Sequence, residues 1–311
     1  NDMASLISQE AERKHIRLER PRYLSKTQRM WVIQSINSHI DGGQLERGYQ
    51  LLKGTVKLGG FNSVDVGIEP NWIEEPFDDR NWLWRWHQWE FARDLLKVWT
   101  VEKDEQAIDL LLAWVRGWLD AHLWGDSKGK MAWHDHATAL RLRNLFYIWA
   151  IREDFENTDS SVISVIEDAI AAHCAILSSD KLYSAKTNHG FDQMSILLQV
   201  ASCCFIFEES PKWVNVANKR LRDEIEFAFT SEGVHVENSP AYHQSMLRRL
   251  IEQSNMFECL DIKDIFPIDD LIEGGLNFLS WIVRPDGTLP LIGDTEHTAI
   301  SPMITNMEYD M

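Results

Sequence analysis

The sequence predicts an all-α protein, and three observations support this prediction. Apolar residues recur with the helical period of about 3.6 residues along most of the 311-residue chain. Strand-like alternation is almost absent until the tail after Pro285. Modest loops separate the helical segments, so neighbouring helices should form antiparallel pairs. Because the sequence shows no repeat of fixed period, a closed (α/α) toroid of helix pairs is favoured over an open solenoid.

About nine to eleven helices are expected, and nine can be placed along the chain. They are residues 27–40, 81–100, 104–119, 135–151, 160–177, 192–207, 211–229, 240–259 and 269–283. The first of them ends before Asp41-Gly42-Gly43, a typical stop signal. Glycines and prolines interrupt the pattern in residues 48–79, which predicts a long connector. Connectors of this length are often functional or packed as lids.

The charge balance excludes some classes of partner. The net charge is −17, whereas binding to nucleic acid or an anionic membrane needs clustered Lys and Arg. The excess is uneven, because residues 181–249 contain eight basic and eight acidic side chains. The first twenty residues lack the apolar core of a signal peptide, and no apolar stretch looks long enough to insert into a membrane. A bacterial-type periplasmic or cytoplasmic protein is therefore expected, and the oligomeric state stays open.

The four cysteines do not suggest a metal or disulfide framework. The chain has no CxxC pair, and the adjacent Cys203 and Cys204 lie in an apolar run. We therefore interpret all four cysteines as reduced residues of the core. Neither a cofactor nor a metal ion is expected within this chain.

Tryptophan is abundant, with 14 residues, most of them between Trp72 and Trp118. Trp82, Trp86 and Trp89 are spaced at i, i+4 and i+7, which places them on one helical face. Indole rings stack on sugar rings but also fill protein cores, so both interpretations remain open. Trp86 and Trp133 are the candidates for sugar binding.

The stretch Trp133-His134-Asp135-His136 leads into a helix that carries Arg141. Two histidines in an HxH pattern can bind zinc from a strand. On a helix their side chains diverge by about 200°, which disfavours a shared metal ion. Polar side chains that open a helix beside a cleft are better explained as binding residues. His134 and Arg141 are therefore candidates for substrate contacts.

Two further polar stretches precede helices. Residues 187–190 read Thr-Asn-His-Gly, in which Asn188 offers neutral donors and His189 can exchange a proton near neutral pH. Further on, Pro240 opens a helix and places Tyr242 and His243 on its first turn. The competing interpretations are a capping asparagine with an exposed histidine, and a structural tyrosine.

Together these stretches resemble the heparinase II/III-like polysaccharide lyases, which include heparin, heparan and alginate lyases. The resemblance covers most of the chain from Asn81 to Asp294. It is carried by the Asn-His pair, by Asn-Ser-Pro-x-Tyr-His at 238–243, and by Pro-Asp-Gly-x-Leu-Pro-x-Ile-Gly-Asp at 285–294. Tyr242 lies 53 residues after His189. The order and spacing of the three motifs are more specific than any one of them.

The resemblance implies a helical toroid followed by a β-sandwich domain. We expect residues 1–283 to form the toroid, and residues 284–311 to be a linker or the start of a sandwich that this chain lacks. The (α/α) toroid of antiparallel helix pairs is then expected to be incomplete, and the chain would be only part of a lyase. The further histidine of the family and the structural metal of some members would belong to the missing part. This chain by itself would bind glycan more readily than it turns it over.

The resemblance also implies a chemistry, β-elimination at a uronic acid of an acidic polysaccharide or oligosaccharide. Asn188 and His189 would neutralise the substrate carboxylate as the C5 proton leaves. Tyr242 would protonate the leaving oxygen and is the third catalytic candidate. His134, Arg141, His243, Trp86 and Trp133 would contact substrate. Members of the family often have Arg near the position of His134, which leaves the preferred substrate open.

Two other functions remain open from the residues. A glycoside hydrolase on an (α/α) toroid needs two facing carboxylates. Asp135, Asp192 and Glu237 are the available candidates, but no pair stands out. A non-catalytic protein that binds glycans or assembles polysaccharide would keep the tryptophans and would not need Tyr242.

Overall fold

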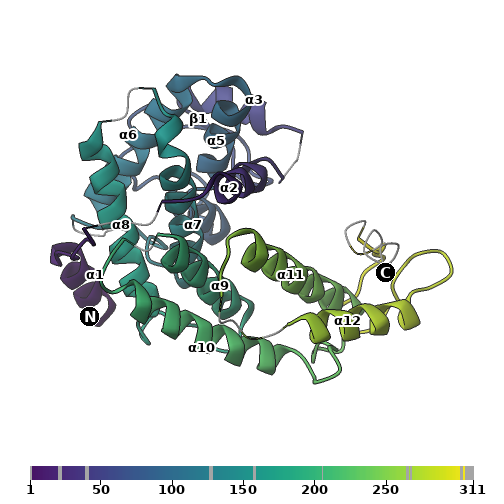
Figure 1. The fold of residues 1–311 in the computed structure, drawn as a ribbon. Coiled ribbons are helices and arrows are strands. Elements are labelled where there is room, and N and C mark those ends of the chain that lie inside the picture. The colour runs from purple at the N-terminus through teal and green to yellow at the C-terminus, as the bar shows by residue number, and fades with distance from the viewer. Residues whose placement is uncertain are drawn as a thin grey trace. The chain divides into compact units, whose positions relative to one another are not determined.

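The computed structural model of the chain is mostly helical (Figure 1). It describes residues 2–19, 23–38, 42–125, 129–156, 159–204, 206–263, 266, 268–301 and 304. Within these residues there are twelve α-helices, and the all-helical fold class is confirmed. They are α1 (Asp2–Glu12), α2 (Lys26–Ser38), α3 (Gln44–Leu51), α4 (Arg80–His87), α5 (Glu90–Glu102), α6 (Glu105–His122), α7 (Asp135–Ile151), α8 (Ser160–Ser178), α9 (Asn188–Cys203), α10 (Ser210–Ala228), α11 (Pro240–Cys259) and α12 (Asp269–Ile282).

The predicted helices agree with the structure in most places. α7 and α11 have the predicted bounds. α1 and α3 were not predicted, and the last two residues of the predicted helix 27–40 lie outside the described residues. The predicted connector 48–79 contains the end of α3 and a short antiparallel hairpin. In that hairpin, β1 (Thr55–Val56) pairs with β2 (Val64–Asp65).

The chain forms two compact units, which are described separately. The first unit comprises Asn1–Ser184 and Asp192–Ala217, and the second comprises Ala185–Phe191 and Asn218–Met311. In the first unit α7 is the central helix. It packs against α2, α4, α5 and α8, and nearly all of its side chains are buried. Because α7 is covered on every side, its polar residues must find their partners inside the protein.

The predicted helix 81–100 is wrong as a single element, because the chain breaks between α4 and α5. Trp89 adopts a left-handed conformation with φ of 63°, which interrupts the helical hydrogen bonds. Side chains of α7 satisfy the carbonyl groups at the break. Arg141 donates to the carbonyl of His87 at 2.6 Å, and Asn144 donates to those of Gln88 and Trp89 at 3.0 and 3.1 Å. A tertiary contact therefore stabilises a break that the local pattern does not indicate.

The tryptophans on the predicted face of this segment belong to the core. Trp82, Trp86 and Trp89 are at most 1% exposed. The ring of Trp86 lies between those of Trp72 and Trp82, at centroid distances of 4.8 and 5.6 Å. Both stacks are close to parallel, so neither face of Trp86 is open to a ligand in this structure. For these three residues the core interpretation applies.

Arg141 is a fully buried cation held by aromatic rings. Its guanidinium carbon lies 3.9 Å from the centroid of Trp118, and its Nε donates to Nε2 of His173 at 2.9 Å. His173 then donates from Nδ1 to the carbonyl of Ala169 at 2.7 Å. Among the described residues no carboxylate pairs with Arg141. Cation–π contacts and hydrogen bonds to neutral acceptors therefore replace the usual ion pair.

α8 is a long apolar helix, and its length and composition alone would allow it to cross a membrane. In this structure 56% of that stretch is buried, and the helix packs against α1, α6 and α7. It carries Cys174, whose burial raises the pKa of the thiol. The four cysteines all lie within the described residues and are free; three of them are buried as predicted, whereas Cys259 is only partly buried and is not a core residue.

The second unit contains α11 and α12, which pack against each other (Figure 1). An isolated bridge joins Phe229 to His235 in the loop before α11. After α12, a bridge between Thr288 and Ala299 folds the tail back on itself. This tail belongs to the second unit. The expected domain boundary after residue 283 stays a prediction.

Replacing Arg141 by Ala should lower the free energy of unfolding by about 3–5 kcal/mol, because it leaves buried acceptors on His87 and His173 without donors and opens a cavity beside Trp118. Urea unfolding measures the change. The control is Arg248→Ala, in which the lost side chain is 49% exposed and the expected change is within about 0.5 kcal/mol. Equal effects of the two substitutions would contradict a structural role for Arg141.

The stability of the chain should fall as the pH is lowered below about 6.5, because buried histidines are neutral in the fold. Burial, with the charge of Arg141, lowers the pKa of His87 to about 2 and that of His122 to about 4. Unfolded histidines bind a proton below about pH 6.5. Above that pH these histidines are neutral in both the folded and the unfolded chain, so their protonation does not favour unfolding and their contribution to stability is fully present. The contribution is lost as the pH falls towards the folded pKa, by about 1.4 kcal/mol per pH unit.

Urea unfolding at pH 7.5 and 5.5 tests this dependence, since most carboxylates stay ionised over that range. His122→Gln keeps a donor for the carbonyl of Trp72, which lies 3.3 Å from Nε2 of His122. This variant should lose less stability between the two pH values than the wild type does. An unfolding free energy that is the same at both values would rule out the neutral histidines as its cause.

Candidate functional site

The opening of α9 carries two of the candidate catalytic residues. The helix begins at Asn188, four residues before the predicted start, because Thr187 acts as its cap. The hydroxyl of Thr187 accepts from the N–H of Gly190 at 3.0 Å, and its carbonyl accepts from Phe191. Asn188 is therefore not the cap. Its side chain is exposed, and that of His189 is half-buried.

The turn before α9 is anchored to α10 within the second unit. Lys186 adopts a left-handed conformation with φ of 60°. Its N–H donates to Oε1 of the buried Glu224 at 2.9 Å. A charge-assisted hydrogen bond to a buried carboxylate holds a backbone firmly. Glu224, which lies 38 positions after Lys186 in the sequence, therefore holds the turn that leads into the Asn-His pair.

The opening of α11 carries the third candidate catalytic residue, Tyr242. Ser239 caps this helix and accepts from the N–H of Tyr242 at 3.4 Å, and Pro240 occupies the first turn. The sequence predicted that Pro240 opens this helix with Tyr242 on its first turn, and the structure adds the cap by Ser239. Tyr242 is 39% exposed, and its hydroxyl has no hydrogen-bond partner among the described residues. The hydroxyl is therefore available to a ligand.

The side chain of His243, which was predicted to contact substrate, is buried in the interior of the second unit. It is 2% exposed and its ring contacts Phe278 edge to face. Its Nδ1 accepts from the N–H of His235 at 3.2 Å, so its Nε2 carries the proton donated to the carbonyl of Gly275 at 3.0 Å. Burial lowers the pKa of both His243 and His235. His235 and His243 are thus neutral at pH 7.

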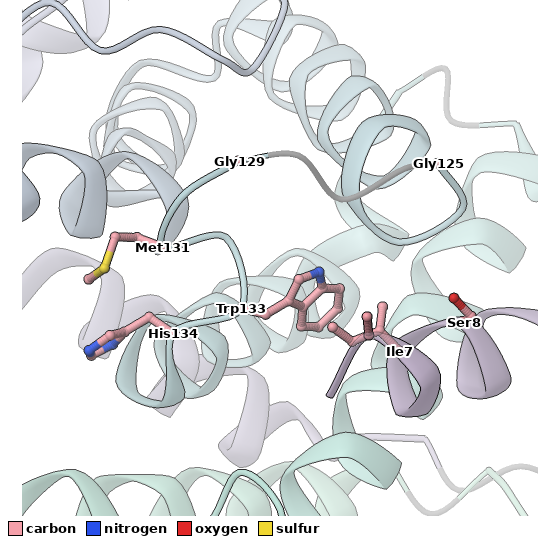
Figure 2. A pocket seen from close by; sticks show the side chains of 8 residues that line it. Ile7, Ser8, Gly125, Gly129, Met131, Trp133 and His134 are labelled. Carbon is pink, nitrogen blue, oxygen red and sulfur yellow. The ribbon is translucent and has the colours of Figure 1, made fainter. Parts of the chain in front are cut away.

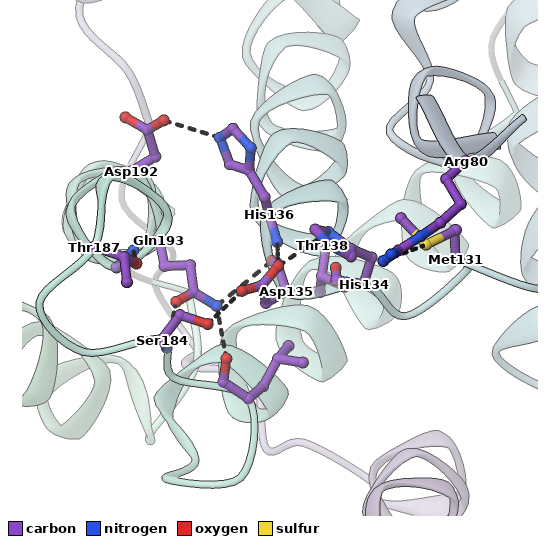
Figure 3. Close-up of polar contacts among 12 residues, drawn as sticks. Arg80, Met131, His134, Asp135, His136, Thr138, Ser184, Thr187, Asp192 and Gln193 are labelled. Atoms are coloured by element: carbon purple, nitrogen blue, oxygen red, sulfur yellow. Dashed lines mark hydrogen bonds and ion pairs between the residues drawn. The ribbon is translucent and has the colours of Figure 1, made fainter. Parts of the chain in front are cut away.

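In the first unit, a polar cluster lies at the opening of α7 (Figure 3). Nδ1 of His134 lies 2.9 Å from Oδ1 of Asp135, and the hydroxyl of Ser184 donates to the other carboxylate oxygen. The N–H of His136 donates to Asp135 at 2.6 Å. Burial alone would raise the pKa of Asp135, but the hydrogen bonds from His134, Ser184 and His136 outweigh it and hold that pKa below its usual value.

A second acid–histidine pair extends this cluster. Nε2 of His136 lies 2.9 Å from Oδ2 of Asp192, and the imidazole stacks on the ring of Trp84 at 5.5 Å. Gln193 lies next to Asp192 on α9, and its amide oxygen accepts from the N–H of Ser184 at 3.0 Å. Sequence analysis named Asp135 and Asp192 only as candidate hydrolase carboxylates. It missed Ser184, which no motif marks and which lies 49 residues from Asp135.

Two predicted binding residues, Trp133 and His134, line a cavity of about 580 Å³ in the first unit (Figure 2). Ile7 and Ser8 of α1 contribute to the wall, together with Met131. The ring of Trp133 is fixed because its Nε1 donates to the carbonyl of His122 at 3.1 Å. A fixed indole beside a polar side chain is a common arrangement for binding a sugar ring.

The other two predicted binding residues of the first unit lie in its core. Trp86 and Arg141 are both 0% exposed. Arg141 approaches the Trp133 ring with its guanidinium carbon 5.0 Å from the centroid. It therefore supports Trp133 from the interior, and neither Arg141 nor Trp86 presents an open surface in this structure. Whether any predicted site residue contacts a substrate stays a prediction.

Comparisons with known proteins agree on one family. Residues 12–310 match the family described as heparinase II/III N-terminus. Comparison with curated protein sequences gave no match. Similar solved structures include a mutant of the heparan sulfate lyase HepC from Pedobacter heparinus, with a TM-score of 0.74 and 19% identity over 95% of this chain and 45% of that one.

Two structures of heparinase III show the same likeness. One has a TM-score of 0.72 and 18% identity over 98% of this chain and 48% of its own. The other has a TM-score of 0.66 and 15% identity over 95% of this chain and 45% of its own. This chain thus spans less than half the length of each. The likeness shows a shared helical fold, consistent with the helical toroid portion of these proteins. With nearly its whole length matched, the chain belongs to the heparinase II/III N-terminus family.

Proposed function

We propose that this chain is the helical part of a polysaccharide lyase that cleaves a uronic-acid-containing polysaccharide by β-elimination. Family membership supports the class of enzyme. The observation that carries the proposal is the exposed Tyr242 at the opening of α11, whose hydroxyl has no hydrogen-bond partner among the residues that the structure describes. Asn188 and His189 open α9 in the same compact unit. These are the residue types that an elimination requires.

The elimination needs three groups from the protein. A base removes the proton at C5 of the uronate, the electron pair forms the C4–C5 double bond, and the bond from C4 to the leaving oxygen breaks. Negative charge grows on the carboxylate in the transition state, and the amide of Asn188 and the imidazole of His189 would stabilise it. Tyr242 would donate its proton to the leaving oxygen. The base is not assigned.

The surroundings of Tyr242 favour its role as an acid. A tyrosine acts as a base when nearby positive charge stabilises the phenolate. The pKa values of His235 and His243 are both lowered by burial, so these neighbours bring no charge at neutral pH. These two histidines therefore offer no positive charge to a phenolate, and we assign Tyr242 the role of proton donor to the leaving oxygen.

Substrate binding would combine open and buried residues. Trp133 and His134 line the cavity of the first unit and would contact sugar directly. The three buried candidates would not contact the sugar and would instead hold other residues in place; they are Trp86, Arg141 and His243. Because one of the similar solved structures is a heparan sulfate lyase, a glycosaminoglycan is the first substrate class to test. Alginate is the second, since the net charge of −17 disfavours the most highly sulfated chains.

A glycoside hydrolase fits the structure less well. Its general acid needs a carboxyl group with a raised pKa. Hydrogen bonds from His134, Ser184 and His136 lower the pKa of Asp135 instead. Asp192 is engaged by His136. The carboxyl group of Asp135 is thus held in the ionised form, and that of Asp192 is paired with His136.

The full-length protein should release unsaturated uronates from heparan sulfate, hyaluronan or alginate, seen as a rise in ultraviolet absorbance. New reducing ends without that absorbance would identify a hydrolase and overturn the lyase. Binding without cleavage of any of the substrates would favour the non-catalytic glycan-binding protein.

Replacing Tyr242 by Phe should lower kcat for elimination by about 100-fold or more, because the leaving oxygen loses its proton donor. Binding of the same oligosaccharide, measured by calorimetry, should change little. The matched control is Tyr49→Phe on α3, since Tyr49 is 41% exposed and Tyr242 is 39% exposed. Turnover that survives in the Tyr242 variant would remove this residue from the proposed role.

A further inference from the structure

The chain after α12 folds back onto the opening of α11. We call residues 284–301 the exit segment, which sequence analysis interpreted as a linker. A bridge joins Thr288 to Ala299, and the N–H of Leu289 donates to the carbonyl of Thr298 at 2.9 Å. Leu289 is fully buried. The exit segment is therefore an ordered part of the second unit.

Thr295 of the exit segment makes the central contact. Its hydroxyl accepts from the N–H of Ala241 at 3.1 Å and lies 3.0 Å from the hydroxyl of Ser239. Thr295 and Ser239 are 7% and 5% exposed. The first N–H groups of a helix have no partner within the helix. Ser239 satisfies the N–H of Tyr242, and Thr295 satisfies that of Ala241, its neighbour.

Two further contacts hold the exit segment against the same turn. Gly293 has a φ of 57°, and a Cβ there would lie 2.3 Å from the carbonyl oxygen of Asn238. Only glycine allows this close approach. On the other side of Tyr242, the amide of Gln244 accepts from the N–H of Ser301 at 2.9 Å and donates to the carbonyl of Ala299 at 3.4 Å.

We propose that Thr295 is a positioning residue for Tyr242, acting through the first turn of α11. This proposal rests on the proposed role of Tyr242 as the acid of the elimination. Tyr242 is 39% exposed, and within the described part of the chain no side-chain contact fixes its hydroxyl, so its place depends on its backbone. The contacts of Thr295 and Gln244 hold that backbone on both sides. A displacement of about 1 Å in a catalytic group can cost about 100-fold in rate.

Thr295→Val removes the hydroxyl and keeps the shape of the side chain. We expect kcat of the full-length protein to fall by about 10-fold, with KM within about 2-fold, because the substrate still binds while the acid is displaced. Thr295→Ser should restore most of the rate, since it returns the hydroxyl. The matched control is Thr298→Val, because the hydroxyl of Thr298 donates to the carbonyl of Glu296 at 3.0 Å and makes no other bond to a described residue. Its kinetics should equal those of the wild type.

Amide hydrogen exchange provides a readout that does not need turnover. The amides of residues 239 and 241–244 should exchange faster in Thr295→Val than in the wild type, while those of α12 stay unchanged. Thr298→Val should leave both regions unaffected. Circular dichroism at the assay temperature checks that each variant is folded.

The outcomes separate the two proposals. An active wild type with equal kcat in Thr295→Val and Thr298→Val would overturn the positioning role and leave the lyase intact. Exchange at residues 239 and 241–244 that does not respond to Thr295→Val would overturn it as well. A wild type without elimination activity would overturn the proposed function, and with it the catalytic role of this contact, even if the exchange pattern were as expected.

Discussion

Arg141 and Asn144 of α7 donate to three carbonyl groups where the chain breaks between α4 and α5, and two of these, on His87 and Gln88, depend on these donors. The left-handed Trp89 at this break turns the chain so that both short helices can pack their tryptophans inward. Unsatisfied carbonyls in a buried site would each cost roughly 1–3 kcal/mol. The packing of the first unit around α7 therefore depends on donors that α7 itself supplies.

This arrangement also sets the electrostatics of the interior. Arg141 brings a charge into the core without a carboxylate partner among the described residues, so the imidazoles around it remain neutral. The lowered pKa values of His87, His122 and His173 all follow from burial beside this cation. In the second unit, burial also lowers the pKa values of His235 and His243, so both are neutral. Most of the buried histidines thus act as hydrogen-bonding groups and not as charges.

The candidate catalytic residues share a different kind of position. Asn188, His189 and Tyr242 all lie in the first turn of a helix, where backbone N–H groups need external partners. Residues distant in sequence supply anchors near them: Glu224 holds the turn before α9, and Thr295 holds the first turn of α11. The side chains themselves stay at least partly open. Open side chains on a firmly held backbone suit a site that must receive a polymer.

Much of the fold and the position of the candidate site could be predicted from the sequence alone. Helical periodicity determined the all-α class and the bounds of α7 and α11, and Pro240 marked the start of the helix whose first turn carries Tyr242. These features depend on residues within a turn or two of each other. The order of the motifs around Asn188 and Tyr242 also pointed to the family.

The tertiary structure decided the rest. Three features depend on partners distant in sequence. They are the break at Trp89, the burial of Arg141 and Trp86, and the hydrogen bond of His243 to Gly275. The apolar pattern continues through Trp89 because both helices face the same core, so periodicity could not reveal the break. Nor could sequence spacing show that Ser184 reaches Asp135 or that Thr295 reaches Ala241. Hydrogen bonds between segments form only once packing has brought those segments together.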